Sequence, residues 1–163
     1  MTVIVNCIGA PGAGKTHTSI MIMEQLVLRN KSFVFIQEQA QLRIYNGYKL
    51  NSDQEYQALI YDTCTKLEEY ISCVDYIVTD GPLLGIQYYL KDHPSLLFGF
   101  NNLLSKIHEH DNRYIFSYLN EERERSFSER NRITNIDDSK NIEKYLLSLD
   151  INYITYSQFI DSL

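Results

Sequence analysis

The chain has 163 residues, a usual length for a single domain with its own hydrophobic core. Its hydrophobic content is 44% and its formal net charge is −6, so the composition gives no support for nucleic-acid binding through a broadly basic surface. It has no apolar run approaching about 18 residues, and its first residues lack the basic region and cleavage site of a signal peptide. We therefore expect a cytoplasmic protein without a membrane span.

Strands and helices are expected to alternate along the chain, as in an α/β fold with a mainly parallel sheet. The expected strands are residues 2–8, 32–36, 76–79, 113–118 and 151–156. The expected helices are 18–29, 54–72, 95–108 and 137–149, with a short helix or loop over 39–47 and no assignment for 157–163. We expect one domain over residues 1–163, with ligands at the carboxyl ends of its strands.

A complete phosphate-binding motif connects the first strand to the first helix. The segment Gly9-Ala10-Pro11-Gly12-Ala13-Gly14-Lys15-Thr16 matches the pattern G-x-x-x-x-G-K-[ST] in the strand–loop–helix context that the motif requires. We expect its backbone N–H groups to bind phosphate, Lys15 to reach the β- and γ-phosphates, and Thr16 to ligate Mg²⁺. A chance match in a glycine-containing turn is the alternative. The residues expected to contact ATP are Gly9, Pro11, Gly12, Ala13, Gly14, Lys15, Thr16 and His17, with a surface role equally open for His17.

Two acidic residues follow neighbouring strands. Asp80 follows the apolar strand 76–79 and resembles a Walker B acid, which holds Mg²⁺ directly or through water; a plain turn aspartate is the alternative. Glu38 follows the second strand, where a carboxylate can accept the proton of an acceptor hydroxyl. A solvated loop glutamate fits the spacing of Glu38 equally well.

A charged segment lies between the fourth and fifth expected strands. Residues 121–132 contain four arginines and four glutamates, so the segment has no net charge. We expect a lid over about 120–136 that closes over ATP and neutralises charge on the transferred phosphoryl group, with Arg123 and Arg130 as its catalytic residues. The alternative is an exposed helix with Glu–Arg pairs.

Other residues give weaker indications. The three cysteines, Cys7, Cys64 and Cys73, have no metal-ligand spacing, and we expect them to be packing residues. Arg43 fits either a phosphate contact or an ordinary surface position. The rings available to stack on an acceptor base are Tyr45, Tyr48, Tyr56, Tyr88 and Tyr89.

The chain resembles the small phage P-loop kinases that include the 5-hydroxymethyluracil DNA kinases, and more distantly the polynucleotide and deoxynucleoside kinases. The resembling pieces are the phosphate-binding motif, Gln37-Glu38-Gln39-Ala40, Asp53-Gln54, the run from Val74 to Leu84, the Arg-rich segment and Ile136-Asp137. The resemblance implies a P-loop NTPase fold, with a five-stranded parallel sheet in the order 2-3-1-4-5 flanked by helices and a lid between strands 4 and 5. It also supports Glu38 as the base on the acceptor side.

The sequence departs from that family at two points. Glu129 precedes Arg130 where a glycine often marks the lid, and Gly81 stands where a serine is common. Neither departure affects the phosphate-binding motif.

Together these features predict a kinase that uses ATP and Mg²⁺ to phosphorylate a hydroxyl of a nucleoside-type acceptor. The sharpest expectation is 5-hydroxymethyluracil in phage DNA, with the enzyme in the host cytoplasm. A free nucleoside or nucleotide, or a polynucleotide 5′-hydroxyl, stays open, because a paired base must be reached in the groove or extruded and the acidic net charge does not favour DNA. A nucleotide-binding regulatory ATPase is the alternative of another class.

Overall fold

The computed structural model describes residues 2–50, 52–90, 93–117 and 136–163. Its centre is a five-stranded parallel sheet with the strand order β2-β3-β1-β4-β5, which confirms the predicted order. The strands are β1 (Val3–Ile8), β2 (Phe33–Ile36), β3 (Tyr76–Thr79), β4 (Asp111–Phe116) and β5 (Tyr153–Ile154). The helices are α1 (Lys15–Leu28), α2 (Gln39–Tyr45), α3 (Asp53–Tyr70), α4 (Leu83–Tyr89), α5 (Pro94–His108), α7 (Ile136–Ser148) and α8 (Tyr156–Asp161).

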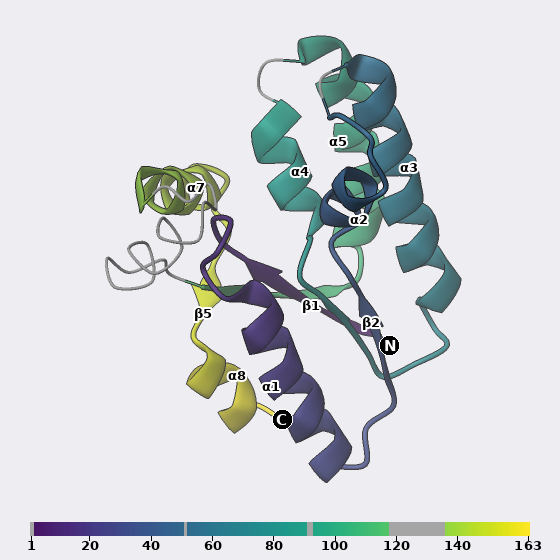
Figure 1. The fold of residues 1–163 in the computed structure, drawn as a ribbon. Coiled ribbons are helices and arrows are strands. Elements are labelled where there is room, and N and C mark those ends of the chain that lie inside the picture. Colours follow the sequence, from purple (N-terminus) through teal and green to yellow (C-terminus); the bar gives the residue numbers. More distant parts are fainter. Residues whose placement is uncertain (1, 51, 91–92, 118–135) are drawn as a thin grey trace.

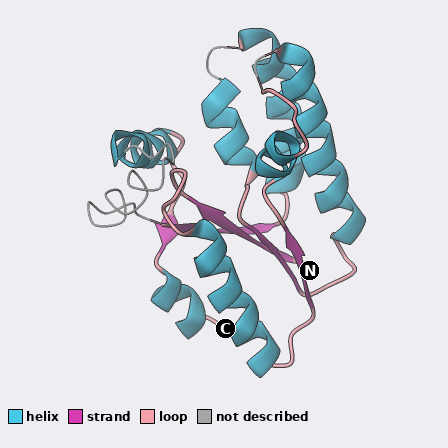
Figure 2. Cartoon of the chain, viewed as in Figure 1, coloured by secondary structure: helices cyan, strands magenta, loops and turns pink. Residues whose placement is uncertain are grey.

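Helices cover both faces of the sheet (Figures 1 and 2). Because side chains alternate along a strand, β1 contributes to both apolar cores. Ile4 and Ile8 belong to the larger core beneath α3, α4, α5 and α7, whereas Val5 and Cys7 belong to the smaller core against α1 and α8. A central strand that is apolar on both faces is typical of a parallel sheet, and it holds the carboxyl end of β1 firmly between the two layers.

The structure corrects several expected elements. Helix α4 had no counterpart in the prediction, and β4 begins and ends two residues earlier than the expected strand 113–118. The expected strand 151–156 contains only the two-residue β5, because Thr155 caps α8 with a capping box in which its side chain and that of Gln158 bond each other's backbone N–H groups. Cys73 is exposed after the end of α3 and is not the packing residue that was expected, whereas Cys7 and Cys64 are buried.

Two further expectations concern membrane spans and the predicted lid. Within the described residues, no helix is long and apolar enough to cross a membrane. The predicted lid, with Arg123 and Arg130, lies outside the described residues, apart from its last residue at the start of α7.

Candidate functional site

The loop between β1 and α1, residues 9–16, is called the glycine loop here, and its backbone needs glycine at three positions. Gly12 and Gly14 have φ values of +79° and +93°, a conformation that other residues rarely adopt. A Cβ on Gly9 would lie 2.4 Å from the carbonyl oxygen of Ser117, so only glycine lets the loop pass the end of β4. The loop is also closed by a hydrogen bond from the Ala13 N–H to the Ala10 carbonyl, at 3.1 Å.

Positive charge gathers where the glycine loop meets α1. The helix begins at Lys15 with Gly14 as its N-cap residue, and no side chain in the described part of the chain caps it there. The first N–H groups of a helix carry a partial positive charge and bind anions. The Lys15 ammonium lies over the loop and donates to the Ala10 carbonyl at 3.3 Å. The loop, helix end and ammonium together form a site that suits phosphate.

Asp80 links three elements at this end of the sheet. It follows β3 and is only 1% exposed. One carboxylate oxygen accepts from the Thr16 hydroxyl at 2.7 Å, and the other accepts from the Glu38 backbone N–H at 2.6 Å. These charge-assisted bonds fix the ends of β2 and β3 relative to α1. The predicted Asp80 and Thr16 therefore lie in direct contact.

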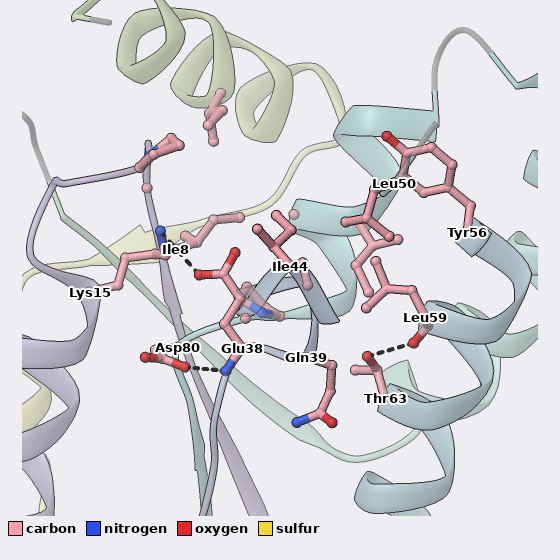
Figure 3. Close-up of a pocket in the computed structure, with 18 residues that line it drawn as sticks. Ile8, Lys15, Glu38, Gln39, Ile44, Leu50, Tyr56, Leu59, Thr63 and Asp80 are labelled. Carbon is pink, nitrogen blue, oxygen red and sulfur yellow. Dashed lines mark hydrogen bonds and ion pairs between the residues drawn. The ribbon is translucent and has the colours of Figure 1, made fainter. Parts of the chain in front are cut away.

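Glu38 lies beside both Asp80 and the glycine loop. Its carboxylate points towards the Lys15 ammonium, with 3.9 Å between the nearest oxygen and nitrogen (Figure 3). Burial raises the pKa of Glu38 above its ordinary value, the nearby Lys15 charge partly opposes this, and Asp80 adds to the rise. The site therefore holds a carboxylate that is a better proton acceptor than a solvated glutamate.

Gly81 explains how Glu38 reaches this position. A Cβ on Gly81 would lie 2.7 Å from the Glu38 Cα and 2.9 Å from its Cβ. No side chain fits between these two strand ends without moving Glu38. Gly81 stands where a serine is common in the resembling family. Here the residues that follow β2 and β3 approach each other unusually closely.

A cavity of about 300 Å³ opens beside Glu38, away from the body of α1 (Figure 3). Lys15, Glu38 and Asp80 lie at one end of it, and the glycine loop contributes Gly9 and Pro11. The rest of the wall comes from α2, α3, α4, α7 and the segments beside them, and it is mainly apolar. Its apolar side chains include Ile44, Leu50, Leu59, Pro82, Ile86 and Ile142. Ligand pockets commonly combine such apolar walls with a few placed polar groups.

The remaining predicted residues lie in less specific positions. Pro11 and His17 are exposed, and Ala13 is buried within the loop. Arg43 does not face the glycine loop, because its guanidinium pairs with Glu55 at 3.3 Å and Asp62 at 2.6 Å. Of the five tyrosines considered, Tyr56 lines the cavity. Tyr45 and Tyr48 are largely exposed, Tyr88 packs on Tyr145, and the side chain of Tyr89 is not described.

Sequence reasoning missed most of the cavity wall. Leu59, Thr63, Ile86 and Ile142 carry no motif, and their sequence pattern is that of ordinary core positions. The short helix α4, which supplies Ile86, was not predicted. A signal was present only at Gly81-Pro82, since a glycine directly after a strand indicates a close backbone approach.

Thr16 and Asp80 are also the residues that suit Mg²⁺. Their hydroxyl and carboxylate oxygens are the hard donors that this ion prefers, and Mg²⁺ commonly takes one or two protein ligands together with phosphate and water oxygens. In the described part of the chain, no group of three or more His, Cys, Asp or Glu side chains forms a dedicated metal site. The donor set fits a metal that arrives with a phosphate ligand.

No protein-family model matches the chain, and no curated protein matches it significantly in sequence. The site is therefore interpreted from its own geometry.

Proposed function

We propose that the protein is a P-loop kinase that transfers the γ-phosphoryl group of ATP to a hydroxyl of a nucleoside-type acceptor. One observation carries the proposal. Lys15, the Thr16–Asp80 pair and Glu38 converge at the carboxyl ends of three adjacent strands, with a cavity opening on the Glu38 side. A phosphate-binding loop and a base facing a second pocket are the two halves that phosphoryl transfer requires.

On the donor side, the glycine loop and the start of α1 would hold the β- and γ-phosphates. Lys15 would exchange its present contacts for phosphate oxygens and stabilise the charge that develops on them. Bound Mg²⁺ would neutralise phosphate charge, with Thr16 and Asp80 as the residues that hold it. Arg123 and Arg130 are proposed to add positive charge from the segment between β4 and α7.

On the acceptor side, Glu38 would accept the proton of the hydroxyl. The acceptor oxygen forms its bond to the γ-phosphorus while the bond from that phosphorus to the bridging oxygen of ADP breaks. The products are a phosphorylated acceptor, ADP and a proton held on Glu38 and later released to water. The raised pKa of Glu38 favours this role, because a stronger base takes the proton more readily near neutral pH.

The acceptor of the sharpest proposal is 5-hydroxymethyluracil in phage DNA, and a nucleoside, a nucleotide or a polynucleotide 5′-hydroxyl is the alternative within the same chemistry. The test is a phosphotransfer screen with γ-labelled ATP and Mg²⁺. Its panel contains DNA with 5-hydroxymethyluracil, unmodified DNA with 5′-hydroxyl ends, deoxynucleosides and their monophosphates. Label on any of these acceptors supports a kinase. Label released only as inorganic phosphate contradicts it and favours a regulatory ATPase.

A further inference from the structure

We infer that the cavity beside Glu38 binds an uncharged, ring-bearing alcohol, and that its described wall does not hold an acceptor phosphate group. This inference rests on the proposed function, because it identifies the part of the acceptor that the enzyme holds. The ring can belong to a free nucleoside or to a base extruded from DNA, since both present the same uncharged surface to the cavity.

The charges on the described cavity wall do not favour an acceptor phosphate group. Among the described residues that line it, Lys15 is the only cation, and it faces the carboxylate of Glu38, while Asp80 lies nearby. Once Lys15 binds the phosphates of ATP and Asp80 holds the accompanying Mg²⁺, the described wall offers an acceptor phosphate the Glu38 carboxylate and no free cationic side chain. Burying a charge without a partner is unfavourable, and like charges make it more so.

A described arginine close to the cavity wall does not change that balance. Arg43 lies on α2 close to the cavity-lining Ile44, but Glu55 and Asp62 on α3 already neutralise it. Its guanidinium also lies over the ring of Tyr48, with 5.6 Å to the ring centroid. Arg43 thus joins α2 to α3, and those two carboxylates already balance its charge.

The size of the cavity suits a single ring. A cavity of about 150 Å³ with apolar walls can accommodate benzene, so about 300 Å³ accommodates a substituted ring and part of a sugar. It is at the small end of the usual range for ligand pockets. A base pair within a duplex does not fit, so a base in DNA enters only when extruded.

Tyr56 is the aromatic side chain in the described cavity wall, and a neighbouring ring holds it in place. Its ring contacts the His93 ring, with 4.8 Å between centroids and 49° between the planes. His93 in turn bonds the Asp53 carboxylate through Nδ1 at 2.6 Å. An aromatic ring fixed in this way suits a base face, because stacking on a pre-positioned ring loses little conformational entropy.

Thr63 adds a polar group to a mostly apolar wall. It is 2% exposed, and its hydroxyl donates to the Leu59 carbonyl at 2.9 Å. Because its proton is used within α3, this hydroxyl can only accept a hydrogen bond from a ligand. A ring with an N–H group suits it, whereas a phosphate oxygen, itself an acceptor, does not.

The experiment compares acceptors that differ by one phosphate group, in the wild type and in Tyr56 variants. It measures kcat and KM for a deoxynucleoside, its 3′- and 5′-monophosphates, and an oligonucleotide with one hydroxymethyl base, at saturating ATP and Mg²⁺. We expect kcat/KM for the free nucleoside or for the modified base in the oligonucleotide to exceed that of the matched monophosphates by about tenfold or more. Which of the two uncharged rings reacts identifies its source. Monophosphates as the better acceptors would overturn the inference.

Tyr56→Ala and Tyr56→Leu, which removes the ring but keeps a large apolar side chain, test the cavity itself. We expect each to raise the acceptor KM about tenfold with little change in the KM for ATP, since a stacking contact is lost on the acceptor side only. Tyr61→Ala is the matched control, because Tyr61 lies on the same helix with 70% exposure and does not line the cavity. Unchanged acceptor KM in both Tyr56 variants would contradict the assignment.

A binding measurement separates this inference from the proposed function. Ligand-observed NMR with the wild type and Tyr56→Leu reports nucleoside binding in the presence of a non-hydrolysable ATP analogue. Binding that Tyr56→Leu weakens, without transfer to any acceptor, would refute the kinase proposal and support the assignment of the cavity. Transfer to an acceptor whose binding does not depend on Tyr56 would support the kinase and overturn the cavity assignment.

Discussion

The glycine loop with the start of α1 and the cavity beside Glu38 differ in how they are built. The proposed donor side is a continuous stretch of chain, the glycine loop and the first turn of α1, in which Lys15 and Thr16 are held by polar contacts. The proposed acceptor side is a mainly apolar cavity with walls largely from α2, α3, α4 and α7. The difference suggests that the donor side is fixed by backbone conformation and charge, and that the acceptor side is fixed by shape. Asp80 and Glu38 stand at the boundary, where a change affects both.

The largest expected effect comes from Lys15. Lys15→Ala removes the side chain that is proposed to stabilise charge on the γ-phosphate, and loss of one such group reduces kcat by about 10²–10³. The measurement is the transfer rate at saturating ATP. Lys31→Ala is the control, because Lys31 is exposed in the turn after α1. A Lys15→Ala variant with wild-type kcat would show that Lys15 does not stabilise the transferred phosphoryl group.

Asp80→Asn is expected to weaken the contacts that Asp80 makes with Thr16 and with the Glu38 N–H. The amide keeps the size of the side chain but loses its charge and one of the two acceptor oxygens that bond Thr16 and the Glu38 N–H. We expect the Mg²⁺ concentration for half-maximal activity to rise about 10–100-fold.

The matched control for Asp80 is Asp75→Asn. Asp75 is exposed at the other end of β3, where it accepts hydrogen bonds from the Ser32 backbone and hydroxyl. Its change should leave the Mg²⁺ dependence unaltered. An equal loss in both variants would indicate a general effect on β3 and no specific role for Asp80.

Gly81→Ala should affect the acceptor side through the backbone. The added methyl would meet the Glu38 Cα at 2.7 Å, so the residues after β2 have to move. Overpacking of this kind costs about 1–3 kcal/mol of unfolding free energy, and the displaced Glu38 should lower kcat about tenfold.

Gly99→Ala serves as the control for Gly81, because a Cβ on Gly99, in α5, has nothing within 4 Å. It should be neutral or raise the unfolding free energy by up to about 1 kcal/mol. Denaturation curves and kcat for the two variants check this pair. Normal activity in Gly81→Ala would show that the position of Glu38 does not depend on the close approach at Gly81.

The smallest effect concerns pH. Because burial raises the pKa of Glu38 above its ordinary value near 4.5, activity that needs its carboxylate should decline as the pH falls through a value higher than 4.5. The measurement is kcat/KM against pH, and Glu38→Gln should lack this acidic limb in its residual activity. A limb at or below the ordinary value would place the titrating base elsewhere.

The same contrast explains what could be predicted from the sequence. Gly9 to Thr16 are contiguous, and glycine spacing has a direct meaning for backbone conformation, so the loop was predicted residue by residue. The strand order that the family resemblance implies is confirmed. Thr16 and Asp80, both expected at a Mg²⁺ site, lie in direct contact, since parallel strands bring their carboxyl ends to one edge.

The cavity wall was not predictable in the same way. Leu59, Ile86 and Ile142 come from three helices, and each is an apolar residue of the kind found in any core. Seven-residue helices such as α4 are also too short to show a clear 3.6-residue period. The capping-box pattern from Thr155 to Gln158, by contrast, was readable and could have indicated α8 in advance.

The central claim is that Glu38 acts as the base for an acceptor held in the cavity, and Glu38→Gln tests it most directly. The amide keeps the size of the side chain and removes its basicity, so ATP affinity should stay within about threefold of wild type while the transfer rate falls about 10²–10⁴-fold. Measuring ATP affinity and single-turnover transfer on the same preparation gives both values. A Glu38→Gln variant that binds ATP and transfers phosphate at the wild-type rate would contradict the account.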